Sequence, residues 1–355
     1  MELVKNQKYL KDLKHTAELS LPWKKLDGKT IVLSGATGLV GSFLIDLLLY
    51  RNLNFGSDIK IIALVRSKNR IYKRFCIPEN TDSFIAIEYD VNIELNNEIN
   101  GVKADYVFHL ASNTHPLQYS SDPIGTIITN IIGLKHLLDY AVATKAERFI
   151  FASSVEVYGE NRGDTQKFKE DYLGYIDCNT LRAGYPESKR AGEALCQAYL
   201  KQEKLNIVIP RLSRTYGPSM LGSDTKAISQ FIKNGVADED IILKSEGTQL
   251  YSYSYVADAV SGLLTCLLLG KSGEAYNISD SNSDISLRDL AAIIADYTGK
   301  KVVFDYPDII EAAGYSKATK AMLDSSKLRE LGWKADYGIK DGLIRTIDIL
   351  KEIEQ

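Results

Sequence analysis

Tyr185 and Lys189 lie four residues apart in the stretch "GYPESKRAGEAL". Residues with this spacing share one face of a helix, so we expect the phenol and the amine to be neighbours. An ammonium group beside a phenol favours the phenolate, which predicts that Tyr185 acts as a base near neutral pH. Any long helix can contain this pair by chance, so the pair gains meaning only from other residues around it.

The stretch "IFASSVEVYGE", Ile150 to Glu160, supplies such residues. It begins as a buried strand and ends in small hydroxyl residues and a carboxylate. We expect Ser154 at the carboxyl end of the strand, where its hydroxyl would hydrogen-bond the same substrate oxygen as Tyr185. Glu156 either acts on a substrate proton or caps a helix and faces solvent.

A third stretch, "LSGATGLVG", predicts a dinucleotide-binding turn between a strand and a helix. Glycine permits the backbone angles of the turn and close approach of a diphosphate to main-chain N–H groups, and the helix N-terminus favours negative charge. The alternative is a glycine-rich turn without a ligand. The residues expected to bind cofactor here are Gly35, Thr37, Gly38, Leu39, Val40 and Gly41.

The ends of the next two strands bear on the choice of cofactor. Arg66 stands where an acidic residue would bind the adenosine ribose, and a cation there suits a 2′-phosphate. This favours NADP over NAD, unless Arg66 belongs to a solvated basic loop. Asp90, followed by Val91, is expected to reach the adenine amino group or to cap a helix.

These residues require a scaffold of alternating strands and helices. Buried apolar runs at about 29–35, 59–65, 84–91, 104–112, 148–154 and 206–212 are expected strands, and helices are expected at about 39–52, 122–144 and 181–201. This alternation predicts an α/β fold, a Rossmann-type doubly wound parallel sheet with a smaller mixed α/β C-terminal substrate lobe. The expected divisions are an N-terminal extension, 1–29, a dinucleotide-binding domain, 30–212, and mainly the substrate lobe, 213–355.

The composition excludes several classes of protein. The chain has 355 residues, 45% of them hydrophobic, and a net charge of −3, so no basic surface predicts a nucleic-acid or membrane partner. Its four cysteines are scattered without metal-ligand spacing, which predicts no metal and favours reduced, buried thiols in a cytoplasmic protein. No apolar run reaches the roughly 18 residues of a membrane span.

The ordered set of motifs resembles the extended short-chain dehydrogenase/reductase family of nucleotide-sugar epimerases, dehydratases and decarboxylases. The resemblance runs from about Lys29 to the end of the chain. It rests on the glycine turn, "HLAS" at His109–Ser112, Asn130, Ser154, Tyr185 with Lys189, "RLSRTYGP" at Arg211–Pro218, and "GEAYNISD" and "LGW".

This resemblance implies a bound nicotinamide cofactor, contacted also by Leu110, Ala111, Ser112 and Asn130. It further implies that Ser154, Tyr185 and Lys189 oxidise a sugar hydroxyl transiently at C4, with Lys189 also holding the nicotinamide ribose. The ketone formed then acts as an electron sink for the next step.

The resemblance also favours one of several such next steps. The family's 4,6-dehydratases and decarboxylases carry a glutamate like Glu156, whereas dTDP-glucose dehydratases place an aspartic acid where this chain has Val155. Valine delivers no proton to a leaving hydroxyl, but loss of carbon dioxide from a β-keto acid needs none. The stretches His109–Gly133 and "LRAGYPESKR" resemble UDP-glucuronate decarboxylases, and Arg182 is a candidate partner for a sugar carboxylate or a surface charge at a helix start.

Two positions depart from the family pattern. Arg214 replaces the asparagine of "RxxNxYGP", and Tyr251 replaces the diphosphate-binding arginine of "GxQxR". Lys226 falls where a basic residue commonly meets the diphosphate, and Arg214, Lys226, Lys317 and Lys320 are candidates to restore the lost charge. Alternatively, the cation at Arg214 indicates a more acidic or differently shaped substrate.

Decarboxylation of an NDP-uronic acid is therefore the first expectation. A 4,6-dehydratase is the alternative, then an epimerase, and then a cofactor-binding scaffold or sensor without catalysis. The apolar helices near 122–144 and 181–201 predict a homodimer, as in this family, although packing on the chain's own sheet also uses one face of each.

Overall fold

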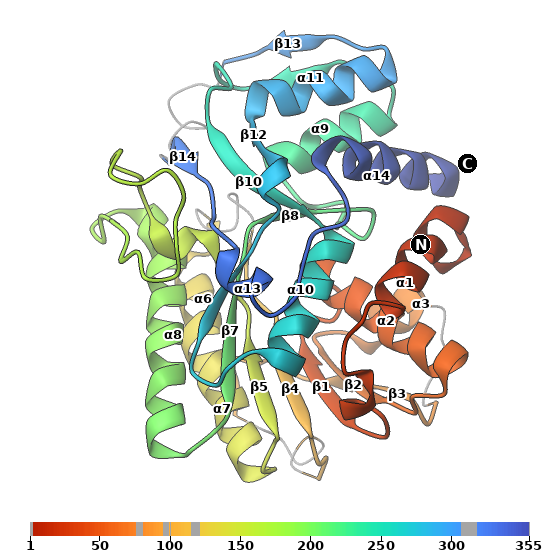
Figure 1. Cartoon of the computed structure of the whole chain (residues 1–355), viewed down its shortest axis with the longest axis vertical. Coiled ribbons are helices and arrows are strands. Elements are labelled where there is room, and N and C mark those ends of the chain that lie inside the picture. The colour runs from red at the N-terminus through yellow and green to blue at the C-terminus, as the bar shows by residue number, and fades with distance from the viewer. Residues whose placement is uncertain are drawn as a thin grey trace.

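The computed structural model of the chain describes residues 3–75, 81–94, 99, 101–114, 121–306 and 318–354. A parallel sheet with helices on both faces forms its larger part, and a smaller mixed lobe lies beyond one end of that sheet (Figure 1). This arrangement confirms the predicted fold class.

The described strands of the main sheet follow the order β11-β7-β5-β4-β1-β2-β3, with β6 paired to β7. All their pairings are parallel. The order reverses between β1 and β4, which is the place where doubly wound sheets bind ligands. The strands are β1 (Thr30–Ser34), β2 (Lys60–Val65), β3 (Phe84–Glu88), β4 (Tyr106–His109), β5 (Arg148–Phe151), β6 (Ser153–Ser154), β7 (Ile207–Leu212) and β11 (Ala275–Ile278).

The sheet separates two hydrophobic cores, which explains why its strands read as continuous apolar runs. In β1, Ile31 and Leu33 pack into one core while Val32 packs into the other, because successive side chains point to opposite faces. One core includes α2 (Leu39–Phe55) and α10 (Val256–Leu269), and the other includes α7 (Leu134–Ala143).

The helix expected near 122–144 contains an irregular turn. It consists of α6 (Pro123–Ile128), a π-helical segment η3 (Thr129–Gly133) and α7. A π turn accommodates an extra residue within a helix and often lies at a functional site. Here it contains Asn130, which is fully buried. The helix expected near 181–201 is a 3-10 turn, η5 (Leu181–Ala183), followed by α8 (Gly184–Gln202).

The smaller lobe begins directly after β7. β8 (Arg214–Tyr216) pairs in parallel with β10 (Leu250–Tyr255), which also pairs with β12 (Asp284–Ser286) and β14 (Lys320–Ala321). In the described part of the chain the lobe also contains a second small sheet and flanking helices: β9 (Ile241–Leu243), β13 (Val302–Phe304), α9 (Ala227–Val236), α11 (Leu287–Thr298) and α14 (Ile339–Glu354). The predicted division after residue 212 stays a prediction, since α10 and β11 pack with the main sheet.

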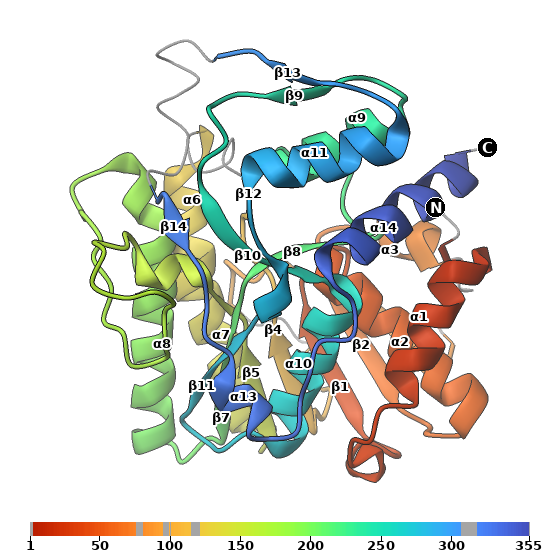
Figure 2. The same ribbon diagram turned by 45° about the horizontal axis from the view of Figure 1, so that its top comes forward.

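The N-terminal extension packs against both parts of the molecule. Its helix α1 (Gln7–Ala17) lies beside α2 and near α14 (Figure 2). The buried carboxylate of Asp12 accepts hydrogen bonds from Tyr255, Tyr337 and Arg345 at 2.7, 3.0 and 2.6 Å. Trp23, at the end of the stretch "LPW", is also buried.

The structure also bears on the expectations for the cysteines and for membrane-spanning helices. Cys196 and Cys266 are buried free thiols, but Cys178 is exposed because it lies in the surface loop before η5, so the expectation of buried thiols is wrong for it. Cys76 lies outside the described residues. Among the helices of the described ranges, none has the length and apolar character needed to cross a membrane.

Candidate active site

The glycine turn is packed so closely against other backbone segments that it has no room for side chains at Gly35 and Gly41. Gly35 has a φ of +77°, and a Cβ added to it would lie 2.7 Å from the backbone N of Ala111. A Cβ on Gly41 would lie 2.2 Å from the carbonyl oxygen of Gly35. Gly38 is the N-cap of α2 and supplies no side-chain cap, so the first N–H groups of this helix remain for another acceptor. These residues fit a dinucleotide diphosphate, with Thr37, Leu39 and Val40 half-buried in the same turn.

The residues expected near the adenosine follow the neighbouring strands. Arg66 is exposed and directly follows β2. Asp90 lies two residues beyond β3, and its Oδ1 accepts the backbone N–H of Asn92 at 2.9 Å, so it caps a turn. The carboxylate of Glu88 accepts the N–H of Lys68 at 3.3 Å in the same region. Contact of Arg66, Asp90 or the buried Val91 with a cofactor stays a prediction.

A chain of side-chain hydrogen bonds connects the end of β4 with helix α8. After Leu110 and Ala111, Ser112 donates its hydroxyl to Oδ1 of Asn130 at 2.7 Å. Asn130 donates from Nδ2 to Ser188 at 2.9 Å, and Ser188 donates to the carbonyl of Tyr185 at 2.8 Å. The π turn thus aims Asn130 at both neighbours and fixes the start of α8.

Tyr185 is buried, and its environment differs from the sequence expectation. Burial raises its pKa to about 12. Hydrogen bonding with Ser154 lowers the pKa, the charge of Glu156 raises it, and Arg182 and a hydrogen bond with Ser112 lower it. The expected lowering of the pKa by a neighbouring ammonium is therefore wrong for the protein alone, because desolvation outweighs the other effects. The expected proximity of Ser154 to Tyr185 is present.

Lys189 lies about one helical turn after Tyr185 on α8, and its exposed fraction is only 2%. Its Nζ donates to the carbonyl oxygen of Ala152 at 2.8 Å and lies 5.9 Å from the centroid of the Tyr185 ring. Burial lowers the pKa of Lys189 to about 7, and the charge of Glu193 opposes this shift. Lysine and tyrosine therefore share one face, as the four-residue spacing predicts.

Glu156 lies between two guanidinium groups in the 3-10 turn η4 (Val155–Tyr158) that follows Ser154. Arg182 Nη2 is 2.9 Å from its Oε2, and Arg214 Nη2 is 3.5 Å from its Oε1. The Arg214 guanidinium stacks 3.5 Å from the ring centroid of Tyr251. Three residues expected to bind substrate thus gather around the expected catalytic carboxylate.

The two remaining substrate-binding expectations lie elsewhere. Lys226 precedes α9, and its Nζ pairs with Asp224 at 2.9 Å. Lys317 lies outside the described residues.

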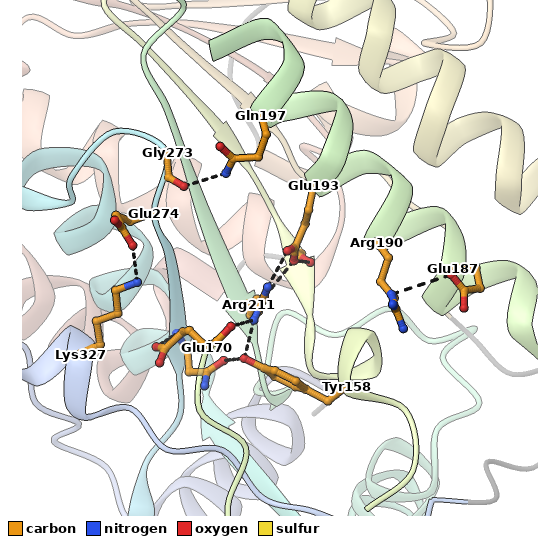
Figure 3. Close-up of polar contacts among 12 residues, drawn as sticks. Tyr158, Glu170, Glu187, Arg190, Glu193, Gln197, Arg211, Gly273, Glu274 and Lys327 are labelled. Carbon is orange, nitrogen blue, oxygen red and sulfur yellow. Dashed lines mark hydrogen bonds and ion pairs between the residues drawn. The ribbon is translucent and has the colours of Figure 1, made fainter. Parts of the chain in front are cut away.

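Sequence reasoning missed a second polar cluster, in which Glu193, Arg211 and Tyr158 meet (Figure 3). Glu193 accepts a bidentate pair of bonds from Arg211, at 2.9 Å from Nε and 2.6 Å from Nη2, and a bond from Ser153 at 2.5 Å. Arg211 Nη1 donates to Tyr158 at 2.8 Å. Glu193 is four residues after Lys189, so the spacing that identified Lys189 also pointed to Glu193.

Comparison with known proteins identifies the family. The profile of the NAD dependent epimerase/dehydratase family matches residues 31–279. The chain belongs to this family. Another member, UDP-glucuronic acid decarboxylase 1 of Xenopus tropicalis, is 31% identical over 330 residues, which cover 92% of this chain and 74% of that protein.

Solved structures of the epimerase/dehydratase type have the same fold. UDP-glucose 4-epimerase from Thermotoga maritima, with UDP-glucose, gives a TM-score of 0.79 at 21% identity and covers 92% of this chain and 100% of its own. UDP-glucuronic acid 4-epimerase from Bacillus cereus, in complex with UDP-glucuronic acid and NAD, gives a TM-score of 0.76 at 24% identity. The match covers 91% of this chain and 99% of that chain. At these identities the likeness concerns the fold.

Proposed function

We propose that this protein oxidises C4 of a nucleotide sugar transiently and decarboxylates an NDP-uronic acid such as UDP-glucuronate. The observation that carries the proposal is the group formed by Ser154, Tyr185 and Glu156 with arginines on both sides of the carboxylate. Similarity to UDP-glucuronic acid decarboxylases over most of the chain supports it.

The proposed first step is proton transfer from the C4 hydroxyl. Tyr185 takes the proton as the phenolate, while Ser154 hydrogen-bonds the same substrate oxygen and stabilises charge that develops on it. Because burial raises the pKa of this phenol to about 12 in the protein alone, the step needs the positive charge that Lys189 and a bound oxidised nicotinamide would place beside Tyr185. When bound on the glycine turn, the nicotinamide dinucleotide would accept the hydride from C4 and return it at the end. Lys189 would hold the nicotinamide ribose, and its buried position beneath Tyr185 suits that role.

The proposed second step is loss of carbon dioxide. The C5–carboxyl bond breaks and its electrons move into the C4 ketone, giving an enolate. C5 then takes a proton that originates in water, and we propose that Glu156 relays it. Val155 is buried and carries no acid, so this route does not depend on protonating a leaving hydroxyl as water elimination would.

The test is mass spectrometry of products from UDP-glucuronate and, separately, from neutral NDP-hexoses, with NAD and NADP each supplied. The expected result is a UDP-pentose from UDP-glucuronate that carries one deuterium when the reaction runs in D₂O. Loss of water from a neutral hexose would instead identify a 4,6-dehydratase, and inversion without mass change an epimerase. Absence of product with every sugar would identify a scaffold or sensor. Y185F is the control for contaminating activity.

We further propose that the cofactor is NADP, because the exposed cation of Arg66 directly follows β2. Titration with NADPH and NADH tests this choice. R66A is expected to weaken NADPH binding about tenfold and to leave NADH binding nearly unchanged, since one charge-assisted bond to the 2′-phosphate would be lost. Tighter binding of NADH by the unaltered protein would contradict the proposal.

We also propose that the protein acts in the cytoplasm as a homodimer formed through α6, α7 and α8. Ile124, Ile128 and Ile132 form a stripe at four-residue spacing, and they are 75%, 37% and 36% exposed. Contiguous apolar surface of this kind is typical of an interface. Analytical ultracentrifugation of I128D tests the proposal: a monomer is expected, whereas L53D, which changes the 85% exposed Leu53 of α2, should remain dimeric.

A further inference from the structure

The two arginines that flank Glu156 hold it unequally. Arg182 makes a hydrogen bond of 2.9 Å to Oε2, whereas Arg214 approaches Oε1 only to 3.5 Å, the outer limit of a hydrogen bond. The Glu156 side chain is 21% exposed, so this is a partly enclosed site where charge interactions are stronger than in open water. Two guanidinium groups face one carboxylate, which leaves a net positive charge in the group.

Arg214 is fixed in position independently of Glu156. Its guanidinium lies 3.5 Å from the ring centroid of Tyr251, and the Tyr251 hydroxyl is anchored by the carbonyl of Ala318 at 2.7 Å. Stacking on an aromatic ring holds the plane of an arginine and leaves its N–H donors for other partners. One of them, Nη1 of Arg214, is buried and has no hydrogen-bond partner within the described part of the chain.

Another cation close to the site has a strong partner already. Arg211 is paired bidentately with Glu193. The contact of Arg214 with Glu156 is long, and its Nη1 donor is buried without a partner in the described part of the chain. An incoming anion can therefore bind Arg214 with little loss of existing interaction energy. Because Glu156 is the group proposed to act at C5, the anion in reach is one carried by the sugar.

We propose that Arg214 is a specificity-determining residue that binds a carboxylate on the sugar, while Arg182 retains Glu156. This inference rests on the proposed function. Two carboxylates then face two guanidinium groups and the local charge is balanced. A neutral sugar leaves Arg214 on Glu156. A product that has lost its carboxylate returns the site to that state and is held more weakly than the substrate.

The test is titration calorimetry with three ligands, UDP-glucuronate, UDP-glucose and UDP, in the presence of NADP. Y185F serves as the background because it prevents turnover during the titration. R214N removes the cation with a small polar side chain, and R214K keeps the charge without the planar fork. Binding of UDP-glucose by R214N reports whether the variant is folded.

The expected result is that R214N weakens UDP-glucuronate binding about 10- to 100-fold and changes UDP-glucose and UDP binding less than about twofold. R214K is expected to retain part of the preference for UDP-glucuronate. Equally weakened binding of all three ligands would overturn the proposal, because it would indicate that Arg214 contacts the diphosphate that the three ligands share. No change with any ligand, or no preference of the Y185F background itself for UDP-glucuronate, would also overturn it.

The outcome separates this inference from the proposed function. If R214N selectively loses UDP-glucuronate but the unaltered protein releases no carbon dioxide from it, the carboxylate site stands and the decarboxylase proposal fails. If carbon dioxide is released but R214N binds UDP-glucuronate normally, the decarboxylase proposal stands and Arg214 has no part in specificity. Should R214N fail to bind any ligand through misfolding, R214K and the ligand preference of the Y185F background decide the matter.

Discussion

The ammonium group of Lys189 donates a hydrogen bond to the carbonyl of Ala152, two residues before Ser154, at 2.8 Å. One helical turn later, Glu193 accepts the hydroxyl of Ser153. Helix α8 therefore contacts two successive residues of the segment that ends in Ser154. These contacts fix Ser154 relative to Tyr185, which α8 also carries.

Burial of Lys189 predicts a pH-dependent cost to stability. Its pKa is lowered to about 7 from an ordinary value of 10.5, so between these values the unfolded chain binds more protons and stability rises with pH. We expect the free energy of unfolding of K189M, minus that of the unaltered protein, to fall as pH rises from 7 to 9, by up to about 1.4 kcal/mol per pH unit. Urea denaturation of cofactor-free protein measures this difference.

The control is K201M, which removes an exposed lysine from the same helix. A difference for K189M that stays constant with pH would show that the buried amine does not change its protonation in this range.

The buried Glu193–Arg211 ion pair is expected to stabilise the protein far more than the exposed Glu187–Arg190 ion pair on α8. Both side chains are more than four-fifths buried, so E193Q leaves an uncompensated guanidinium and should cost about 3 kcal/mol. The matched control is E187Q, because Glu187 and Arg190 form an exposed pair at 3.9 Å (Figure 3) and its loss should cost less than about 0.5 kcal/mol. Equal unfolding midpoints in urea for both variants would refute the expectation.

Gly41 is expected to tolerate no side chain. A Cβ there would lie 2.2 Å from the carbonyl oxygen of Gly35, so G41A must displace the turn that is proposed to bind the diphosphate. We expect at least a tenfold loss of NADPH affinity, on the order of 1.4 kcal/mol, in a fluorescence titration. G222A is the control, because a Cβ on Gly222 meets nothing within 4 Å. Unchanged affinity in G41A would exclude the glycine turn as the diphosphate site.

Replacing Glu156 is expected to change binding and turnover in opposite directions. E156Q removes the carboxylate that competes for Arg214, so UDP-glucuronate should bind more tightly, by up to about tenfold. Product formation should fall about 100-fold, because the group proposed to relay the C5 proton is lost. Calorimetry and single-turnover assays measure the two effects. Weaker binding of UDP-glucuronate by E156Q would contradict the role given to Arg214.

Sequence patterns predicted the scaffold well because each pattern had a local cause. Alternating strands and helices gave the sheet, and the spacing of Tyr185 and Lys189 placed both on one helix face. The pKa of Tyr185 was not predictable in this way, because it depends on how much water the folded chain removes from the phenol. The exposure of Cys178 likewise depends on a loop whose position no periodicity describes.

The contact between Arg214 and Tyr251 was also beyond local patterns. The two residues are 37 positions apart and meet because β8 and β10 pair, with Arg214 opposite Tyr253. The sequence marked each as a departure from the family pattern, but only the pairing of the strands shows that the two departures touch.

Strand β11 lies at the outer edge of the main sheet, although elements of the small lobe both precede and follow it in the chain. The polypeptide leaves the sheet after β7, builds the first part of the lobe, returns to pair β11 with β7, and then builds the rest of the lobe. Because segments of the lobe lie on both sides of β11 in the chain, the lobe is not one continuous segment. Exchanging residues 213–355 for those of a relative would also replace strand β11 of the main sheet. A single replacement such as R214N leaves this framework intact and can therefore test substrate preference in the folded protein.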